Sequence, residues 1–295
     1  MTVVSVVIPT YNARAYLADT LASVRDQTLR DVEVVLVDDG SADDTLEVAR
    51  GFGTSLDLNI IAQADAGPAA ARNAGIHAAR GRYCAFIDSD DTTQPTRLAD
   101  QAALLGTEPD LGLVYSDLET FDESGVIHAT RRAFSDPQQG RVLDALLLDN
   151  FITTSTVMAP KERLVEAGLF DPRRRVSEDL DLWLRIACRW RIGYIDRPLV
   201  RYRRRPGSLS DDKLRTGQAA LDVIEGFWEA HPEYAALHPE LVRRSVARQL
   251  LAAGAAAATQ RRQGLALSYL AKALRLEPGN VNTWKWLVKT ALPSP

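Results

Sequence analysis

Apolar residues fall in short blocks through the first hundred positions of the chain. A block rich in β-branched residues, without alternating polar positions, lies at 3–9; further apolar blocks lie at 32–37 and 83–87, and a weaker one lies at 58–62. Such blocks are typical of strands buried on both faces. Leu17, Leu21 and Val24 have the apolar spacing of a helix after the first block, and 68–80 is an alanine-rich helix that ends at Gly81. The alternation predicts an α/β fold with a mostly parallel sheet flanked by helices.

The pattern is less regular from residue 110 to residue 210. Pro95 is expected in the first turn of a helix, and a helix at 178–191 carries Leu180, Trp183 and Leu184 on one face. The other expected elements are strands at 111–115 and 154–158, a hairpin at 118–129 that turns at 123–125, and helices at 141–148 and 161–167. This part therefore extends the sheet domain with mixed elements.

Beyond residue 211 the chain reads as helix throughout, in three or four segments. Positions 266–278 resemble the second half of a tetratricopeptide unit, and one partial unit cannot form a solenoid. We therefore expect a sheet domain at 1–212, with halves at 1–100 and 101–212, and an all-helical C-terminal region at 213–295. This region is interpreted as a cap on the sheet domain. A surface for a partner, a second copy of the chain or a membrane is the alternative.

Composition narrows the class of protein further. The chain has 295 residues and a formal net charge of −4, which gives no general attraction for nucleic acid or for anionic lipid. No stretch approaches the roughly 18 apolar residues that a membrane span needs, and the opening apolar block is too short for a signal segment. We expect a cytoplasmic protein, with peripheral contact at the inner face of the membrane as the alternative.

Polar residues follow the first two predicted strands where these strands end. Pro9, Thr10 and Tyr11 close the first strand, and the tyrosine ring offers a flat face for a base. Asp38 and Asp39 close the second, and two adjacent carboxylates at a buried strand end repel each other unless something binds them. The alternative for the first group is an ordinary strand end at Pro9. In a doubly wound sheet this edge is where ligands bind.

A helix that begins after Gly67 carries a single cation, Arg72, among small residues. Small side chains allow this helix to lie close to the sheet and to a ligand. The spacing differs from the G-x-G-x-x-G of dinucleotide-binding folds, which argues against a nicotinamide enzyme. Arg72 either faces a ligand or forms a structural ion pair with Asp88 or Asp38.

The strand at 83–87 ends in an acidic run, Asp88-Ser89-Asp90-Asp91. Three carboxylates within four residues repel one another strongly without a cation. Oxygen ligands of this kind, shared with substrate phosphates, hold Mg²⁺ or Mn²⁺ in many proteins. The alternative is a solvated acidic turn whose last residue, Asp91, starts the following helix.

Together these four segments resemble the family-two glycosyltransferases of the bacterial polysaccharide type, over about residues 3–210. The resemblance implies a GT-A fold, a nucleoside-diphosphate sugar donor, with a UDP-sugar expected, and inversion at the anomeric carbon. It places Thr10, Tyr11, Asp39 and Arg72 around the base. The first half of the sheet domain would then bind the donor and the second half the acceptor, which is a glycan, a lipid-linked molecule or a small molecule.

The same resemblance implies roles for the residues of the acidic run. Asp88 would lie near the ribose, Ser89 beside it would also contact the substrate, and Asp90 would hold the divalent metal through a D-x-D-type motif. Glu178 and Asp179 match a Glu-Asp pair that precedes an aromatic helix, and in that pattern Asp179 is the general base. The alternative is a first helical turn in which both acids, behind Ser177 as N-cap, complement the helix dipole.

The segment 202–210 resembles a loop that closes over the donor, and one position departs from the family pattern. Arg205 stands where relatives often have histidine. An arginine can bind a diphosphate with two parallel hydrogen bonds, but it cannot be a metal ligand. A solvated basic strand edge is the alternative. Two other functions stay open: a sugar-1-phosphate nucleotidyltransferase, and a non-catalytic binding protein on a glycosyltransferase frame.

Overall fold

The computed structural model describes residues 2–131, 135–205, 207–208 and 211–291. The chain divides into two compact units, one of Met1–Leu143 with Phe151–Arg205 and one of Asp144–Asn150 with Pro206–Pro295. The expected division into a sheet domain at 1–212 and a helical region at 213–295 remains a prediction. Asp144–Asn150, expected in the second half of the sheet domain, groups with the helical unit instead.

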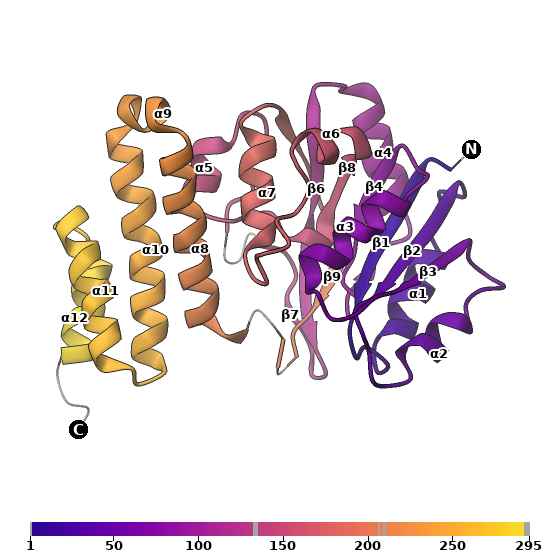
Figure 1. The fold of residues 1–295 in the computed structure, drawn as a ribbon, viewed down its shortest axis with the longest axis horizontal. Coiled ribbons are helices and arrows are strands. Elements are labelled where there is room, and N and C mark those ends of the chain that lie inside the picture. Colours follow the sequence, from indigo (N-terminus) through magenta and orange to yellow (C-terminus); the bar gives the residue numbers. More distant parts are fainter. Residues whose placement is uncertain (1, 132–134, 206, 209–210, 292–295) are drawn as a thin grey trace. The chain divides into compact units, whose positions relative to one another are not determined.

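In the described part of the first unit, one mixed sheet of nine strands has the order β3-β2-β1-β4-β8-β6-β9-β5, and β7 pairs with β6 outside this order (Figure 1). Strands β1 to β4 are parallel, and β6 is parallel to β9, whereas β8, β5 and β7 run antiparallel to their partners. The strands are β1 Val4–Thr10, β2 Val32–Asp38, β3 Leu58–Ala62, β4 Tyr83–Phe86, β5 Thr92–Thr93, β6 Leu111–Asp122, β7 Gly125–His128, β8 Val157–Pro160 and β9 Arg191–Arg203. The predicted α/β class, with a parallel sheet in its first half, is confirmed.

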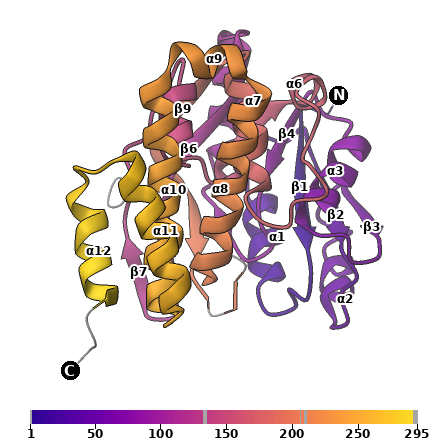
Figure 2. The same ribbon diagram turned by 60° about the vertical axis from the view of Figure 1, so that its left-hand side comes forward.

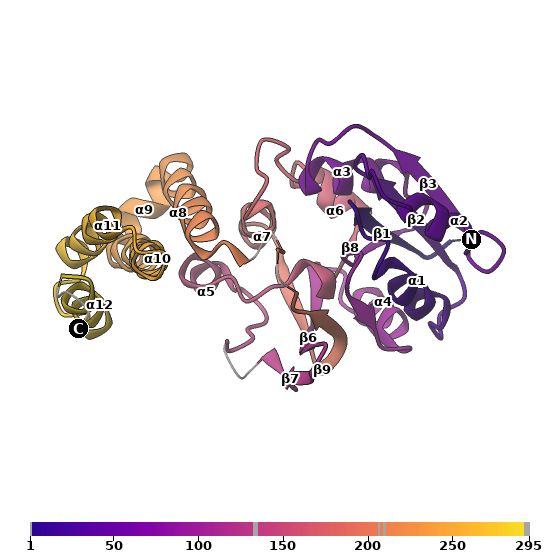
Figure 3. The same ribbon diagram turned by 90° about the horizontal axis from the view of Figure 1, so that it is seen from below.

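Helices cover both faces of this sheet, because successive residues of each buried strand point to opposite sides. One face packs on α1 and α4, and the other packs on α3 (Figure 3). Val34 and Leu36 of β2 belong to the first core, whereas Val35 and Val37 belong to the second. The helices of this unit are α1 Leu17–Arg25, α2 Thr45–Arg50, α3 Pro68–Ala78, α4 Arg97–Thr107, α6 Lys161–Glu166 and α7 Glu178–Ala187.

Several predicted boundaries are wrong. The helix expected at 178–191 ends at Ala187, and Arg191 already begins β9, a long strand that the sequence did not predict. The strands expected at 111–115 and after 118 are one strand, β6. Pro9 does not stop β1, which continues to Thr10, because β4 ends at Phe86 and leaves the side where proline lacks its N–H without a partner strand.

The second unit is helical in its described residues. Its helices are α5 Leu143–Leu148, α8 Lys213–Ala230, α9 Pro232–Leu237, α10 Pro239–Thr259, α11 Gln263–Leu276 and α12 Val281–Ala291, so five helices follow residue 211 where three or four were expected (Figure 2). Leu221, Leu250 and Ala273 join α8, α10 and α11 in one buried cluster. Trp228 donates its indole N–H to the Ser245 hydroxyl, at 2.9 Å, inside this unit.

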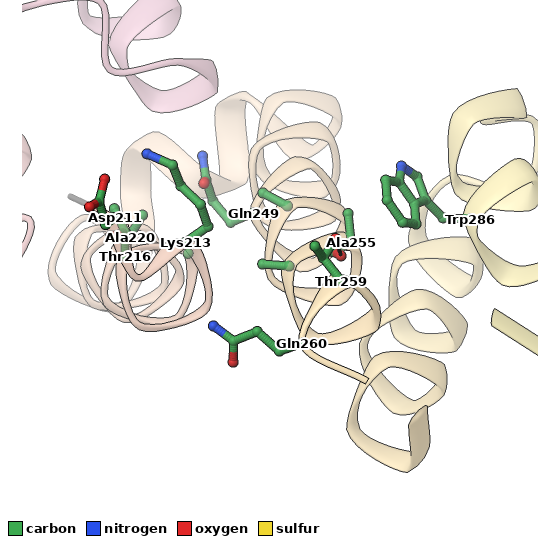
Figure 4. A pocket seen from close by; sticks show the side chains of 12 residues that line it. Asp211, Lys213, Thr216, Ala220, Gln249, Ala255, Thr259, Gln260 and Trp286 are labelled. Atoms are coloured by element: carbon green, nitrogen blue, oxygen red, sulfur yellow. Dashed lines mark hydrogen bonds between the residues drawn. The ribbon is translucent and has the colours of Figure 1, made fainter. Parts of the chain in front are cut away.

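A groove of about 550 Å³ lies within the helical unit (Figure 4). Small residues of α8 and α10 form much of its wall, and Trp286 of α12 stands at one side. The interpretation of the helical unit as a cap and the alternative of a partner surface both remain predictions. Across the described residues, no helix is both long and apolar enough to cross a lipid bilayer.

Candidate active site

The predicted site residues gather at the carboxyl edge of the sheet. The chain passes from β1 outward to β2 and β3, and then returns to place β4 on the other side of β1. The strand order therefore reverses between β1 and β4. In open α/β sheets, ligands bind in the crevice beyond the carboxyl ends of the strands at such a point.

Thr10 and Asp38 lie opposite each other at the ends of β1 and β2. Both are buried, and the hydroxyl of Thr10 and one carboxylate oxygen of Asp38 have no hydrogen-bond partner within the described chain. The other oxygen of Asp38 accepts the Ser41 backbone N–H at 3.2 Å. A buried polar atom without a partner costs about 1–3 kcal/mol. Two of them at one sheet edge point to a ligand that supplies the partners.

Asp39 and Tyr11 lie at the same edge with different surroundings. The Asp39 carboxylate accepts the backbone N–H groups of Ala66 and Gly67, at 2.9 and 2.8 Å, and the side-chain amide of Gln63. These bonds fix the loop that leads into α3. Tyr11 is 55% exposed. Stacking of a base on its ring remains a prediction.

Arg72 joins two acidic segments that are ninety residues apart in the chain. Its guanidinium donates to Asp88 at 2.8 Å and to Glu178 at 2.5 Å. Burial lowers the pKa of Arg72, but the two carboxylates outweigh burial and hold this pKa above its ordinary value. The ion pair with Asp88, one of the alternatives that the sequence left open for Arg72, is present. The structure therefore brings the acidic run and the start of α7 together around one fixed cation.

The acidic run is held in place by its backbone as well as by its side chains. The Thr20 hydroxyl lies 3.0 and 2.7 Å from the carbonyl oxygens of Ser89 and Asp91, and the Asp88 N–H donates to the Ser155 hydroxyl at 3.0 Å. Asp91 is fully buried, and burial together with Asp90 and Asp88 raises its pKa well above the ordinary value. The expectation that Asp91 starts the next helix is wrong, because α4 begins at Arg97 after Thr96.

Asp90 forms an ion pair with Arg205. Arg205 donates its Nε–H to one carboxylate oxygen of Asp90 at 2.6 Å. Burial and the neighbouring charge of Asp88 raise the pKa of Asp90, and Arg205 opposes this rise. Arg205 therefore lies beside the acidic run, and its binding of the donor remains a prediction. The alternative of a solvated basic strand edge does not describe Arg205, because this residue binds Asp90. Pro206, Leu209 and Ser210 of the predicted loop lie outside the described residues.

Asp179 and Glu178 begin α7. Glu178 is buried against Arg72, and Asp179 is half-buried, with its carboxylate 3.4 Å from the Thr154 hydroxyl. Ser177 takes the N-cap position in a left-handed conformation, with φ of 59°, and its side chain makes no capping hydrogen bond. The acids therefore do more than complement the helix dipole, because one of them pairs with a cation from α3.

Residues outside the predicted set also support the site. Asn73 makes two hydrogen bonds to the backbone of Phe170, at 2.8 and 3.0 Å, and the Phe170 ring packs on Trp183 and lies 5.6 Å from the Arg72 guanidinium. Thr154 and Ser155 contribute hydroxyls from a single 3₁₀ turn, where a strand was expected. The run of four hydroxyl residues at 153–156 was the signal in the sequence that marked this turn.

The donor set suits a hard divalent cation only in part. Within the described chain, no three or more His, Cys, Asp or Glu side chains form a ready metal site. Asp88 and Asp90 each keep a second carboxylate oxygen beyond the one that their arginine uses. Mg²⁺ and Mn²⁺ are commonly bound by one or two carboxylates together with substrate phosphates. The residues present therefore fit a metal that arrives with a diphosphate.

Comparison with known proteins agrees with this arrangement. The model of the family Glycosyl transferase family 2 matches residues 5–166. An uncharacterized glycosyltransferase of Rickettsia felis is 32% identical over 203 residues, which are 68% of this chain but 33% of that protein. The chain therefore spans about a third of the length of this relative. TuaG of Bacillus subtilis, a putative teichuronic acid biosynthesis glycosyltransferase, is 28% identical over 77% of this chain and 89% of its own.

Solved structures share the fold. TarS of S. aureus, residues 1–349 in complex with UDP-GlcNAc, has a TM-score of 0.63 at 18% identity and covers 98% of this chain and 90% of its own. The mannosyltransferase PcManGT from Pyrobaculum calidifontis, in complex with GDP-Man and Mn²⁺, has a TM-score of 0.63 at 21% identity, with coverages of 98% and 84%. The predicted GT-A fold is confirmed. Because the family model matches more than half of its residues, this chain belongs to family 2 of the glycosyltransferases.

Proposed function

We propose that this protein transfers a sugar from a nucleoside-diphosphate sugar to an acceptor hydroxyl, with inversion at the anomeric carbon. The observation that carries the proposal is the bridge made by Arg72, which bonds to Asp88 and Glu178. A donor-binding acidic run and a candidate base, far apart in sequence, thereby share one site. The strand order that reverses beside them supports a nucleotide ligand at this edge.

The nucleotide end of the donor would bind at the ends of β1 and β2. The unpartnered Thr10 hydroxyl and Asp38 oxygen offer hydrogen bonds to a base or a ribose, and the exposed Tyr11 ring offers a surface for stacking. Asp39 would act at the edge of the base and also holds the loop before α3. UDP-GlcNAc in TarS and GDP-Man in PcManGT support a nucleotide sugar as donor. We infer a UDP-sugar.

Asp90, with Asp88 beside it, would hold a divalent ion together with the diphosphate. When bound, Mn²⁺ or Mg²⁺ supplies positive charge that stabilises the leaving nucleoside diphosphate. Arg72 meanwhile fixes Asp88, and Arg205 offers a second cation that can bind phosphate oxygens in pairs. Mn²⁺ in the PcManGT complex supports this choice of metal.

Asp179 would take the proton from the acceptor hydroxyl. Glu178, held by Arg72, fixes the first turn of α7, and Thr154 lies against the Asp179 carboxylate. The acceptor oxygen then attacks the anomeric carbon from the face opposite the phosphate, so a single displacement inverts the configuration. We place the acceptor among glycans, lipid-linked glycans and small molecules. The similarity to TuaG supports a role in polysaccharide or glycoconjugate synthesis.

A panel of radiolabelled UDP-, GDP- and dTDP-sugars, incubated with the protein and Mn²⁺, tests the proposal. Slow hydrolysis of one donor, with release of the nucleoside diphosphate, is expected even without the acceptor, because water can replace the acceptor hydroxyl. Cleavage that requires pyrophosphate would indicate a nucleotidyltransferase instead. If no donor is bound or hydrolysed, the protein is a binding or scaffold protein on a glycosyltransferase frame.

A further inference from the structure

Two arginines at and just after the end of β9 bind the acidic run in different ways. Arg203 donates its backbone N–H to the Asp91 carboxylate at 2.8 Å and its Nε–H to the backbone oxygen of Asp90 at 3.0 Å. Arg205 donates its Nε–H to the Asp90 carboxylate, at 2.6 Å. Arg203 therefore anchors the strand, whereas Arg205 neutralises the carboxylate that the metal would need.

Both arginines pack on the ring of Tyr16. The guanidinium carbons of Arg203 and Arg205 lie 5.0 and 5.3 Å from the centre of the Tyr16 ring, which favours cations on its face. The Asp90 side chain is 16% exposed and that of Arg205 is 32% exposed. The pair is partly shielded from water, so its attraction is screened less than that of a surface pair.

Arg205 and a divalent ion compete for the same group. Guanidinium remains protonated at all ordinary pH values and cannot become a ligand, so a metal on Asp90 must contend with its charge. A diphosphate changes this balance, because it offers Arg205 paired phosphate oxygens in place of one carboxylate oxygen. It also supplies oxygen ligands to the metal itself.

We propose that Arg205 and the divalent metal exchange on Asp90 when the donor binds. Without a nucleotide, Arg205 occupies Asp90 and weakens metal binding. The donor's diphosphate draws Arg205 onto itself and leaves Asp90 to the metal. Metal and nucleotide then bind with positive coupling, and each strengthens the other by the same factor. The inference rests on the proposed function, because it takes the diphosphate and the metal from that site.

Mn²⁺ binding to the full chain, followed by the electron paramagnetic resonance signal of free Mn²⁺, tests the exchange with and without UDP. For the wild type we expect weak binding of Mn²⁺ alone and binding on the order of 10-fold tighter with saturating UDP. R205M should bind Mn²⁺ alone on the order of 10-fold more tightly than the wild type, and UDP should tighten its Mn²⁺ binding by a smaller factor than in the wild type, because only the phosphate ligands still contribute. R205K keeps the positive charge and should stay near the wild type without UDP.

Two controls separate this effect from others. Arg204 is an exposed neighbour whose backbone N–H donates to Phe121, so R204M should bind Mn²⁺ as the wild type does. In the double variant D90A/R205M the gain in Mn²⁺ affinity should disappear, because D90A removes the carboxylate that R205M would release. Circular dichroism and the melting temperature confirm that each variant is folded.

The exchange is wrong if folded R205M binds Mn²⁺ alone no more tightly than the wild type does. It is also wrong if the wild type binds UDP equally well with Mn²⁺ and with EDTA, since Arg205 then replaces the metal altogether. In either case the proposed transfer of a sugar survives. That proposal fails separately, if neither the wild type nor R205M binds any nucleotide or nucleotide sugar.

Discussion

Several charged residues of the candidate site form ion pairs with residues from distant segments. The role of one charged residue, Asp179, can be tested directly. Asp179 carries the proposed proton transfer, and Arg72 binds its neighbour Glu178. We expect D179N to lower kcat by a factor on the order of 10²–10⁴. Binding of UDP with Mn²⁺, measured by calorimetry, should change less than about threefold, since an amide of the same shape replaces the acid.

Asp181, one turn into the same helix, provides the control. It pairs with Arg185 at 2.6 Å and belongs to the packing of α7. D181N should keep kcat within a few-fold of the wild type. Turnover of D179N at the wild-type rate would remove Asp179 from the proton transfer, whereas equal losses in both variants would indicate a defect in the helix.

Glu33 is a buried carboxylate away from the site, and it makes stability depend on pH. Burial raises the pKa of Glu33, but the Ser5 hydroxyl and Arg80, the latter through its backbone N–H and its charge, lower the pKa below the ordinary 4.5. Because the folded-state pKa is lowered, this stabilisation is present above pH 4.5 and is lost as the pH falls through the folded value. We expect E33Q to lower the free energy of unfolding by about 1–3 kcal/mol at pH 7.

Urea unfolding of E33Q and wild type between pH 3 and pH 7 tests this expectation. The difference between them should shrink below about pH 4, as the wild-type carboxylate takes up its proton. Asp57 shares Arg80 but is exposed, so D57N should change stability by less than about 0.5 kcal/mol. A difference between E33Q and the wild type that stays constant with pH would show that packing, and not charge, is responsible.

For single residues, the sequence predicted where carboxylates gather and offered Arg72 as one possible partner of Asp88, but it did not determine which cations neutralise them. The strand ends at Asp38 and at Asp88 were predictable from apolar blocks, because burial on both faces leaves a clear signature. That Arg72 binds Asp88 and Glu178 together, and that Arg205 binds Asp90, depends on loops whose course no local pattern determines. Ion pairs across ninety residues of sequence need the fold.

The contact between α3 and β1 is a feature of whole elements, and it depends on the absence of a side chain at Gly75. A methyl group there would overlap Cγ1 of Val7, which is fully buried in β1. The helix would gain about 1 kcal/mol in backbone propensity from alanine. Overpacking against a strand costs about 1–3 kcal/mol and exceeds this gain. We therefore expect G75A to lower stability and, because α3 carries Arg72, to weaken UDP binding.

Gly106 in α4 is the matched control. A methyl group at this position meets no heavy atom of the described chain within 4 Å. G106A should raise the free energy of unfolding by about 0.5–1 kcal/mol through helix propensity alone. Chemical denaturation of both variants, with calorimetry of UDP binding, distinguishes them. Stabilisation of both to the same extent would mean that α3 can move away from β1 without penalty.

The elements that the sequence predicted poorly share a physical cause. β9 was missed because its buried residues are interrupted by arginines and by Pro198, so neither strand nor helix periodicity stands out. Its position comes from pairing with β6 along almost its whole length, which is a tertiary contact. α7 was predicted too long for the same reason, since Arg191 continues a helical pattern until the ladder with β6 begins.

At the scale of the whole molecule, the two units have separate hydrophobic cores, and this separation predicts separate responses. In the helical unit, Leu250 packs with Leu221 and Ala273. Truncation of a buried leucine to alanine costs about 2–5 kcal/mol. L250A should therefore speed amide hydrogen exchange in peptides of α8, α10 and α11, and leave peptides of β1 to β4 within about twofold of the wild type.

Binding of UDP with Mn²⁺ should change amide hydrogen exchange in the sheet unit and not in the helical unit. A ligand that binds only the folded protein stabilises it by about 2.7 kcal/mol at 100 times its dissociation constant. Protection should therefore rise around the carboxyl ends of β1, β2 and β4, and stay unchanged in α10. Mass spectrometry of peptides from both experiments reports each unit separately. Faster exchange of β1 to β4 in L250A, to the same extent as in α10, would mean that one cooperative core spans both units, because only shared stability transmits a local cavity to a distant sheet.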